Sequence, residues 1–249
     1  MKKIGIIGGS GLDDPGLLHE PEEKTVVTPY GEPSTPLLCG DVEGVEVVII
    51  ARHGKQHQFS PTQVNYRANI HALKAQEVTH ILATTACGSL KKEIGRGHFV
   101  ILDQFIDFTK KRKNTFFESF EGEDLSAHTP MADPFDESLR RVLIDTSGQM
   151  ELTTHERGTV ITIEGPRFST RAESKMFQAW GADVINMSIA TEAALANEAE
   201  IPYAAVAMST DYDCWKEHED PVSWEGVMEV FNSNAQAVKD LLLTAVTKI

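Results

Sequence analysis

Two carboxylates, Asp211 and Asp213, follow an apolar run near the C-terminal end of the sequence. If the chain is extended there, both side chains lie on one side of it, because residues two apart share a face of a strand. Adenine presents an N7 acceptor and an N6 amino donor on one edge. A protonated carboxyl group can donate to N7 and an ionised one can accept from the amino group, and burial favours the first state. The pair therefore predicts purine recognition, with two solvated loop acids as the alternative.

A guanidinium and an imidazole, Arg52 and His53, stand directly after a second apolar run. Both groups can bind phosphate without a metal, the guanidinium as a fork and the imidazole as a donor. Ser10 lies in a glycine-rich loop whose N–H groups can hold an oxyanion, and Thr84 and Thr85 add hydroxyl groups. A largely neutral cradle with one arginine suits an inorganic anion that must react as a nucleophile. The alternative is a surface cation beside a packed histidine.

Common nucleotide and metal motifs do not fit these residues. A dinucleotide fingerprint placed on Gly9 and Gly11 needs a third glycine where Asp14 stands. His53 and His57 are four residues apart, but no third ligand completes a zinc motif around them. We therefore expect no metal in this site.

The elements that must position these residues are short apolar runs, which are typical of strands buried on both faces. The runs are Lys3–Gly8, Val45–Ala51, His80–Thr84, Phe99–Phe105, Thr159–Glu164, Ala182–Met187 and Tyr203–Met208. Helical segments are expected at Val64–Gln76, Phe135–Asp145, Arg171–Trp180, Glu192–Glu200 and from Ser223, as an N-cap, to about Thr247. The alternation predicts one α/β domain over residues 1–249, with a central mixed or mainly parallel β-sheet flanked by helices.

Six of the expected strand ends carry small, polar or charged residues. Ligands of open α/β sheets bind outside the carboxyl ends of the strands, so these ends predict one polar pocket. Phe168 and Met187 stand beside two of the ends and could sandwich a base and a sugar, with core packing as the alternative. The stretch Asp107–Pro130 is polar and lacks periodicity, which is typical of a functional loop or an interface element.

Composition limits the partners and the compartment. The 249 residues carry 23 Lys and Arg against 37 Asp and Glu, a net charge of −14, which argues against nucleic acid and anionic membranes as partners. The three cysteines are far apart and form no CxxC pair, which fits a reducing cytoplasm. No apolar stretch approaches the roughly 20 residues of a transmembrane helix. We expect a soluble, cytoplasmic protein.

Seven segments carry a family pattern, in the family's order: Gly8–Leu12, Ala51–Gly54, Val64–Ile70, Thr84–Leu90, Glu164–Ser169, Gly181–Met187 and Thr210–Trp215. With them the chain closely resembles the 5′-methylthioadenosine phosphorylases of the trimeric purine nucleoside phosphorylase family, from residue 4 to about 247. The resemblance implies a purine nucleoside phosphorylase-like fold. It also implies phosphorolysis of an N-glycosidic bond to adenine and 5-methylthioribose 1-phosphate, with inorganic phosphate as co-substrate and without a cofactor or metal.

The resemblance also assigns site residues. The phosphate site would comprise Ser10, Arg52, His53, Thr85, Ala86 and Ser188. The nucleoside would be bound by Met187 at the ribose, Phe168 over the purine, and Ser169, Asp211 and Asp213 at the base. In the family a histidine matched by His128 reaches the site of a neighbouring subunit of the homotrimer. Trp224 stands where a smaller aliphatic residue is usual, with Val227 and Met228 one helical turn later.

The mechanism that these assignments imply has two ends. Phosphate bound by Arg52 and His53 beneath C1′ stabilises an oxocarbenium-like sugar. Asp211 hydrogen-bonds or protonates N7 of the leaving adenine, and Asp213 reads its amino group. The 6-oxopurine relatives carry Asn at Asp213 or its neighbour, and an amide can donate to an oxo group where a carboxylate cannot. The aspartate pair therefore favours 6-aminopurines.

The group at the 5′ position is less constrained. The sequence given ends at Ile249, where longer family members continue into a helix that closes the methylthio pocket of a neighbour. The Trp224 indole could replace that wall or narrow the pocket, or it could belong to an ordinary buried helix face. Three alternatives stay open: the same fold acting on adenosine, 5′-methylthioinosine or inosine; a hydrolase, which would want a carboxylate-rich Ca²⁺ site; and a purine-binding module, which would leave Arg52 and His53 without a role.

Overall fold

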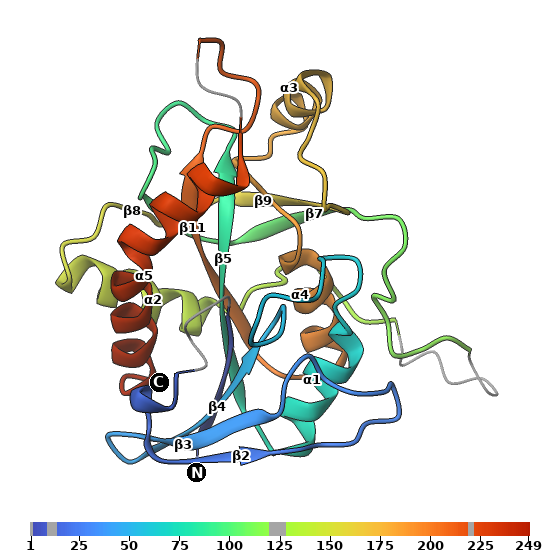
Figure 1. Ribbon diagram of the computed structural model, residues 1–249, viewed down its shortest axis with the longest axis vertical. Helices are drawn as coiled ribbons and strands as arrows, with labels where there is room; N and C mark the ends of the chain where they lie inside the picture. The colour runs from blue at the N-terminus through green and yellow to red at the C-terminus, as the bar shows by residue number, and fades with distance from the viewer. Residues whose placement is uncertain (1, 9–13, 120–127, 219–221) are drawn as a thin grey trace.

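A computed structural model of the chain describes residues 2–8, 14–119, 128–218 and 222–249. Within these residues the strands form one mixed sheet (Figure 1). The strands are β1 (Lys3–Gly8), β2 (His19–Lys24), β3 (Leu37–Val42), β4 (Val45–Ala51), β5 (His80–Ser89), β6 (Phe99–Ile101), β7 (Gln104–Phe108), β8 (Thr154–His155), β9 (Thr159–Ile163), β10 (Val184–Asn186) and β11 (Tyr203–Asp211). The helices are η1 (Pro15–Leu17), α1 (Tyr66–Ala75), α2 (Glu137–Gln149), α3 (Arg171–Ala179), α4 (Ile189–Glu198) and α5 (Trp224–Val246).

The centre of the sheet is parallel. The strand β5 pairs in parallel with β1 on one side and with β11 on the other, and β4 continues the parallel set beyond β1. Antiparallel pairs enter at β3 with β4, at β6 with β11, and at β10 with the last residues of β5. The predicted mixed α/β architecture is confirmed.

Helices cover both faces of the central strands, which explains their continuous apolar sequence. In β11, Tyr203, Ala205 and Ala207 face a cluster that contains α1 and α4 residues, whereas Ala204, Val206 and Met208 face one that contains α2 and α5 residues. Figure 1 shows the two helix pairs on opposite sides of β5 and β11. A strand with period-two side chains and two buried faces must be apolar at every position.

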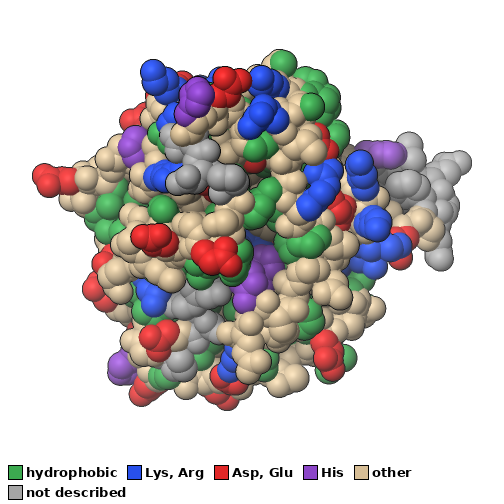
Figure 2. Space-filling view, turned by 45° about the horizontal axis from the view of Figure 1, so that its top comes forward, with side chains coloured by type: hydrophobic (Ala, Val, Ile, Leu, Met, Phe, Trp, Pro, Cys, Tyr) green, Lys and Arg blue, Asp and Glu red, His purple; other side chains and the backbone are tan. Residues whose placement is uncertain are grey.

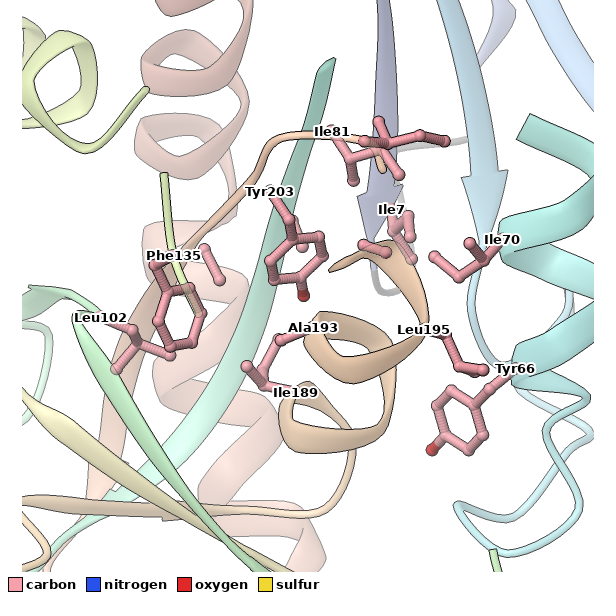
Figure 3. Close-up of a cluster of buried hydrophobic side chains, with 14 of the residues drawn as sticks. Ile7, Tyr66, Ile70, Ile81, Leu102, Phe135, Ile189, Ala193, Leu195 and Tyr203 are labelled. Atoms are coloured by element: carbon pink, nitrogen blue, oxygen red, sulfur yellow. The ribbon is translucent and has the colours of Figure 1, made fainter. Parts of the chain in front are cut away.

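The helix α4 lies inside the first of these clusters. Ile189, Ala193 and Leu195 are fully buried in it, and Figure 3 shows them close to Tyr203 of β11 and Tyr66 of α1. The N-terminus of such a helix can contribute to a site in the interior of the protein, because its first N–H groups have no partner inside the helix.

Several element boundaries differ from the predicted ones. The expected strand Phe99–Phe105 is two strands, β6 and β7, separated at Leu102 and Asp103. The strand expected to end at Thr84 continues to Ser89, and α4 begins three residues before Glu192. The other expected strands and helices are present, with ends that differ by a few residues. The strands β3 and β8 and the short helix η1 were not expected. Ser223 accepts a hydrogen bond from Gly226 N–H and is the predicted N-cap of α5.

The charged strand β2, with the sequence HEPEEK, was not expected. All six residues are exposed, and the strand is held at the sheet edge by antiparallel pairing with β3. The described parts of the polar stretch after Phe108 (109–119 and 128–130) contain no helix or strand. No helix among the described residues is long and apolar enough to span a bilayer.

Candidate active site

A cavity of about 490 Å³ lies where the ends of β4, β5, β9, β10 and β11 meet the start of α5. Figure 2 shows the molecule hollowed on one face, with histidine side chains inside the hollow. Residues from five of the six predicted strand ends line this cavity. Of the sixth, Gly9, Ser10 and Gly11 lie outside the described residues.

Arg52 lines the cavity from a fully buried position and is fixed by a carboxylate that the sequence analysis missed. Nε donates to Glu192 Oε1, Nη2 donates to Oε2 at 2.9 Å, and Nη1 donates to the carbonyl oxygen of Thr84 at 2.8 Å. Arg52 is 2% exposed and Glu192 0%. Three of the five guanidinium N–H groups therefore donate to the protein itself, and two remain for a ligand. The guanidinium was predicted to bind phosphate with its whole fork, and only part of that fork is available. The carboxylate neutralises a buried cation that would otherwise be costly.

His53 is neutral, and its tautomer is set by a backbone contact. Its Nδ1 lies 2.9 Å from the carbonyl oxygen of Phe59, which can only accept, so Nδ1 carries the proton. Burial and the neighbouring Arg52 charge lower the pKa of His53 to about 4. The other ring nitrogen, Nε2, is then an acceptor. Where we expected a donor to phosphate, the structure offers a partner for a protonated phosphate oxygen.

Hydroxyl groups and a helix N-terminus complete this end of the cavity. The hydroxyl of Thr84 is buried and has no hydrogen-bond partner among the described residues. Thr85 and Ala86 follow it along β5 and also line the cavity. Ser188 is the N-cap of α4 but its side chain makes no capping bond, so its hydroxyl is available to a ligand. A helix N-terminus and free hydroxyls favour an anion at this place.

Asp211, the last residue of β11, and Asp213 stand at the opposite end. The chain is not extended between them: Asp213 has φ +47°, and its N–H donates to Asp211 Oδ1 at 2.7 Å. The assumption of an extended chain was therefore wrong, and a turn brings the two carboxylates together instead. The hydroxyl of Ser169 lies 2.8 Å from each Asp213 oxygen.

The two carboxylates differ in their surroundings. Burial raises the pKa of Asp211; hydrogen bonds from Thr210 and from Asp213 N–H oppose the shift, and the Asp213 charge adds to it. Asp211 is thereby biased toward its protonated, donating form. Asp213 is 6% exposed and accepts a hydrogen bond from the Ser169 hydroxyl. The two carboxylates thus have different hydrogen-bond partners.

Phe168 and Met187 line the space between the two ends. Phe168 is 38% exposed, so its ring is not fully buried in the core and can contact a ligand. The loop between β9 and Phe168 passes tightly behind Met187. Gly165 has φ +67°, a conformation that favours glycine, and a Cβ there would lie 2.5 Å from Met187 Sδ.

The mouth of the cavity has an aromatic wall. The rings of His53 and His57 are stacked with centroids 4.5 Å apart, and the His57 ring lies 5.2 Å from the indole of Trp224. Trp224 is 49% exposed, whereas Val227 is buried. Val227 and Met228 line the cavity beside Trp224, as the one-turn spacing predicts.

The cavity therefore brings together all but two of the predicted site residues. The lining includes Arg52, His53, Thr85, Ala86, Phe168, Ser169, Met187, Ser188, Asp211, Asp213, Trp224, Val227 and Met228. Ser10 lies outside the described residues. His128 is exposed and does not line the cavity of its own chain.

Sequence reasoning missed two charged residues that support the site. The sequence analysis placed Glu192 in a helix but gave it no role. The only feature of the sequence that could have indicated one is a carboxylate within an otherwise apolar segment. Arg112 lies in the polar stretch after Phe108, and its side chain is 1% exposed. Only a partner distant in the sequence explains either residue. Among the described residues, no group of three or more His, Cys, Asp or Glu side chains is arranged to hold a metal ion.

The fold and the site agree with the comparisons with known proteins. The model of a family described as the phosphorylase superfamily matches residues 3–247, and the chain belongs to that superfamily. It is similar to the S-methyl-5′-thioadenosine phosphorylases of Danio rerio and Xenopus tropicalis, at 53% and 54% identity. Both alignments cover 99% of this chain and 89% of the relative. The family that the seven segments indicate is confirmed.

Solved structures show the same likeness. Methylthioadenosine phosphorylase from Schistosoma mansoni, in complex with adenine, has a TM-score of 0.93 and 42% identity, over 99% of this chain and 91% of that one. A mutant adenosine/methylthioadenosine phosphorylase from the same organism, in complex with methylthioadenosine, has a TM-score of 0.92 at 42% identity, over 99% and 91% of the two chains.

Proposed function

We propose that the protein is an S-methyl-5′-thioadenosine phosphorylase, which cleaves the N-glycosidic bond of 5′-methylthioadenosine with inorganic phosphate. Besides the family relationship, one structural observation supports this reaction: a single cavity has an anion-binding end and a purine-reading end. Arg52 and Ser188 lie at the first end, and Asp211 and Asp213 at the second. A purine-binding module would have no use for the first end, and a hydrolase would not need it.

At the anion-binding end, phosphate is held by the free N–H groups of Arg52, the Thr84 and Ser188 hydroxyls and the α4 N-terminus. The Thr85 hydroxyl, which donates to the Ala86 carbonyl oxygen at 2.9 Å, joins them by turning toward the phosphate. The neutral Nε2 of His53 accepts from the protonated phosphate oxygen. One phosphate oxygen attacks C1′ while the C1′–N9 bond breaks, and the phosphate charge stabilises the cationic sugar. The chemistry uses no cofactor, because the phosphate itself is the nucleophile.

At the purine-reading end, Asp211 donates its proton to N7 as the bond electrons move onto adenine. Asp213, oriented by Ser169, accepts from the amino group and holds the base in register. Phe168 packs over the purine and Met187 contacts the ribose. Trp224, Val227 and Met228 form the wall for the 5′ group.

The test is adenine release from 5′-methylthioadenosine with and without inorganic phosphate, beside adenosine and inosine. Release that requires phosphate and is fastest with the methylthio substrate supports the proposal. Faster release from adenosine, or cleavage of inosine, keeps a phosphorylase and assigns a different substrate. Release without phosphate identifies a hydrolase and overturns the proposal.

The working form is further proposed to be a homotrimer in which His128 reaches the site of a neighbouring copy. Its support is the family resemblance and the exposed position of His128, away from its own cavity. Sedimentation equilibrium should give a mass about three times that of the 27.4 kDa chain. A monomer mass would contradict it.

A further inference from the structure

Arg112 is a buried cation that lies outside the cavity and belongs to no predicted site. Its side chain is 1% exposed, although the neighbouring Lys111 and Lys113 are exposed. The guanidinium makes three hydrogen bonds: Nε to Glu164 Oε1 at 3.1 Å, Nη1 to the Tyr66 hydroxyl at 2.8 Å, and Nη2 to the Glu164 carbonyl oxygen at 2.8 Å. A surface loop does not need a cation buried in this way.

The Glu164 carboxylate binds the other side of the same cluster. It accepts from the N–H groups of Lys110 and Lys111 and from the Thr62 hydroxyl, as well as from Arg112. Burial alone would raise the pKa of Glu164, but these hydrogen bonds outweigh it and lower the pKa to about 2. The carboxylate is therefore ionised at neutral pH, where it pairs with Arg112.

Three segments of the cavity wall meet at this ion pair. The Tyr66 hydroxyl lies 3.0 Å from the Pro61 carbonyl and 3.4 Å from the Met187 carbonyl, and Arg112 stacks 4.9 Å from the Tyr66 ring. Glu164 directly precedes the Gly165-Pro166 turn that packs against Met187. Pro61, Pro166 and Met187 all line the cavity, whereas Arg112, Glu164 and Tyr66 do not.

We propose that Arg112 is a positioning residue for the ribose side of the nucleoside site, acting through Glu164 and Tyr66 on the wall that contains Met187. The inference rests on the proposed function for the identity of the ligand. Arginine is required because one planar fork reaches two acceptors on Glu164 and one on Tyr66, which a lysine ammonium cannot do. The base-reading residues Asp211 and Asp213 make none of these contacts.

The experiment measures equilibrium binding of 5′-methylthioadenosine and of adenine, which lacks the ribose, to the full chain. Arg112→Met should weaken methylthioadenosine binding by about tenfold and adenine binding by less than twofold. Arg112→Lys should fall between this variant and the parent. Lys111→Met is the matched control, because its side chain is exposed and its N–H contact with Glu164 is kept; both affinities should stay unchanged.

If Arg112→Met does not fold, Tyr66→Phe tests the same link, since it removes the hydroxyl and keeps the ring. It should weaken methylthioadenosine binding two- to fivefold and leave adenine binding unchanged. Equal weakening of both ligands, or no change in either, would show a merely structural role and overturn the proposal. Methylthioadenosine that binds to the parent protein but is not cleaved would overturn the proposed function and leave this one standing.

Discussion

The anion-binding end of the cavity and its aromatic wall are built in opposite ways. Arg52 and Glu192 are a buried ion pair set between β4, β5 and α4, and at most 2% of either residue is exposed. Trp224 stands at the first turn of α5, half exposed, and contacts the His57 ring. A change inside the first region disturbs the core and the chemistry together, whereas a change at the wall alters only what the mouth admits. Reaction type and substrate choice are thus determined in different places.

The largest effect is expected at Asp211, which is largely buried at the purine-reading end of the cavity. Asp211→Asn keeps a donor near N7 but cannot transfer a proton to it. General acid catalysis contributes typically 10²–10⁴-fold, so kcat should fall by about that factor while KM for phosphate changes little. Steady-state kinetics with both substrates varied will measure this. A kcat within threefold of the parent would remove Asp211 from the mechanism.

Breaking the buried ion pair should affect stability as well as phosphate use. Arg52→Met removes the ion-pair partner of Glu192 in the core, at a cost of about 3–5 kcal/mol, and weakens phosphate binding. The double variant Arg52→Met with Glu192→Gln should recover most of the stability but not the phosphate affinity. Urea unfolding and phosphate KM separate the two effects. Recovery of phosphate use in the double variant would contradict the phosphate role of Arg52.

His53 should make the protein less stable as the pH falls. Its pKa is about 4 in the folded protein against about 6.5 unfolded, so between these values the unfolded chain binds more protons. Stability is therefore complete above pH 6.5 and is lost as the pH falls toward 4. At pH 5 the loss is about 2 kcal/mol, and His53→Gln should show a loss smaller by that amount. Parallel unfolding curves at pH 7.5 and 5.0 provide the measurement.

The smallest effect is expected at the aromatic wall. Trp224→Val should reduce the preference for 5′-methylthioadenosine over adenosine, measured as the ratio of kcat/KM values, by about three- to tenfold, because apolar contacts at the 5′ group are lost. The phosphate KM should not change. Trp180→Val is the control, since Trp180 is equally exposed but lies at the end of α3, outside the cavity. An unchanged ratio would mean that Trp224 only packs against His57.

The same contrast shows which features could be predicted from sequence. Strands such as β4 and β11 were found because burial on both faces makes their central residues apolar. The edge strand β2 was missed because all its residues are exposed and most are charged, and only pairing with β3 makes it a strand. Helix and strand periodicity report burial, not pairing.

Site residues at strand ends were found for the same reason. Asp211 and Arg52 follow apolar runs, so their positions at one edge of the sheet could be inferred. Glu192 and Arg112 could not, because each acts on a partner 52 or more residues away in the chain. The turn at Asp213 could not be predicted either, since a positive φ at a non-glycine residue depends on its local hydrogen bonds.

The most direct test of phosphorolysis is to follow inorganic phosphate by ³¹P NMR while 5′-methylthioadenosine is consumed. A sugar-phosphate ester signal should grow in step with adenine, at the expense of inorganic phosphate. Adenine released while the inorganic phosphate signal stays constant would contradict it, because the buried anion-binding end would then have no part in the reaction.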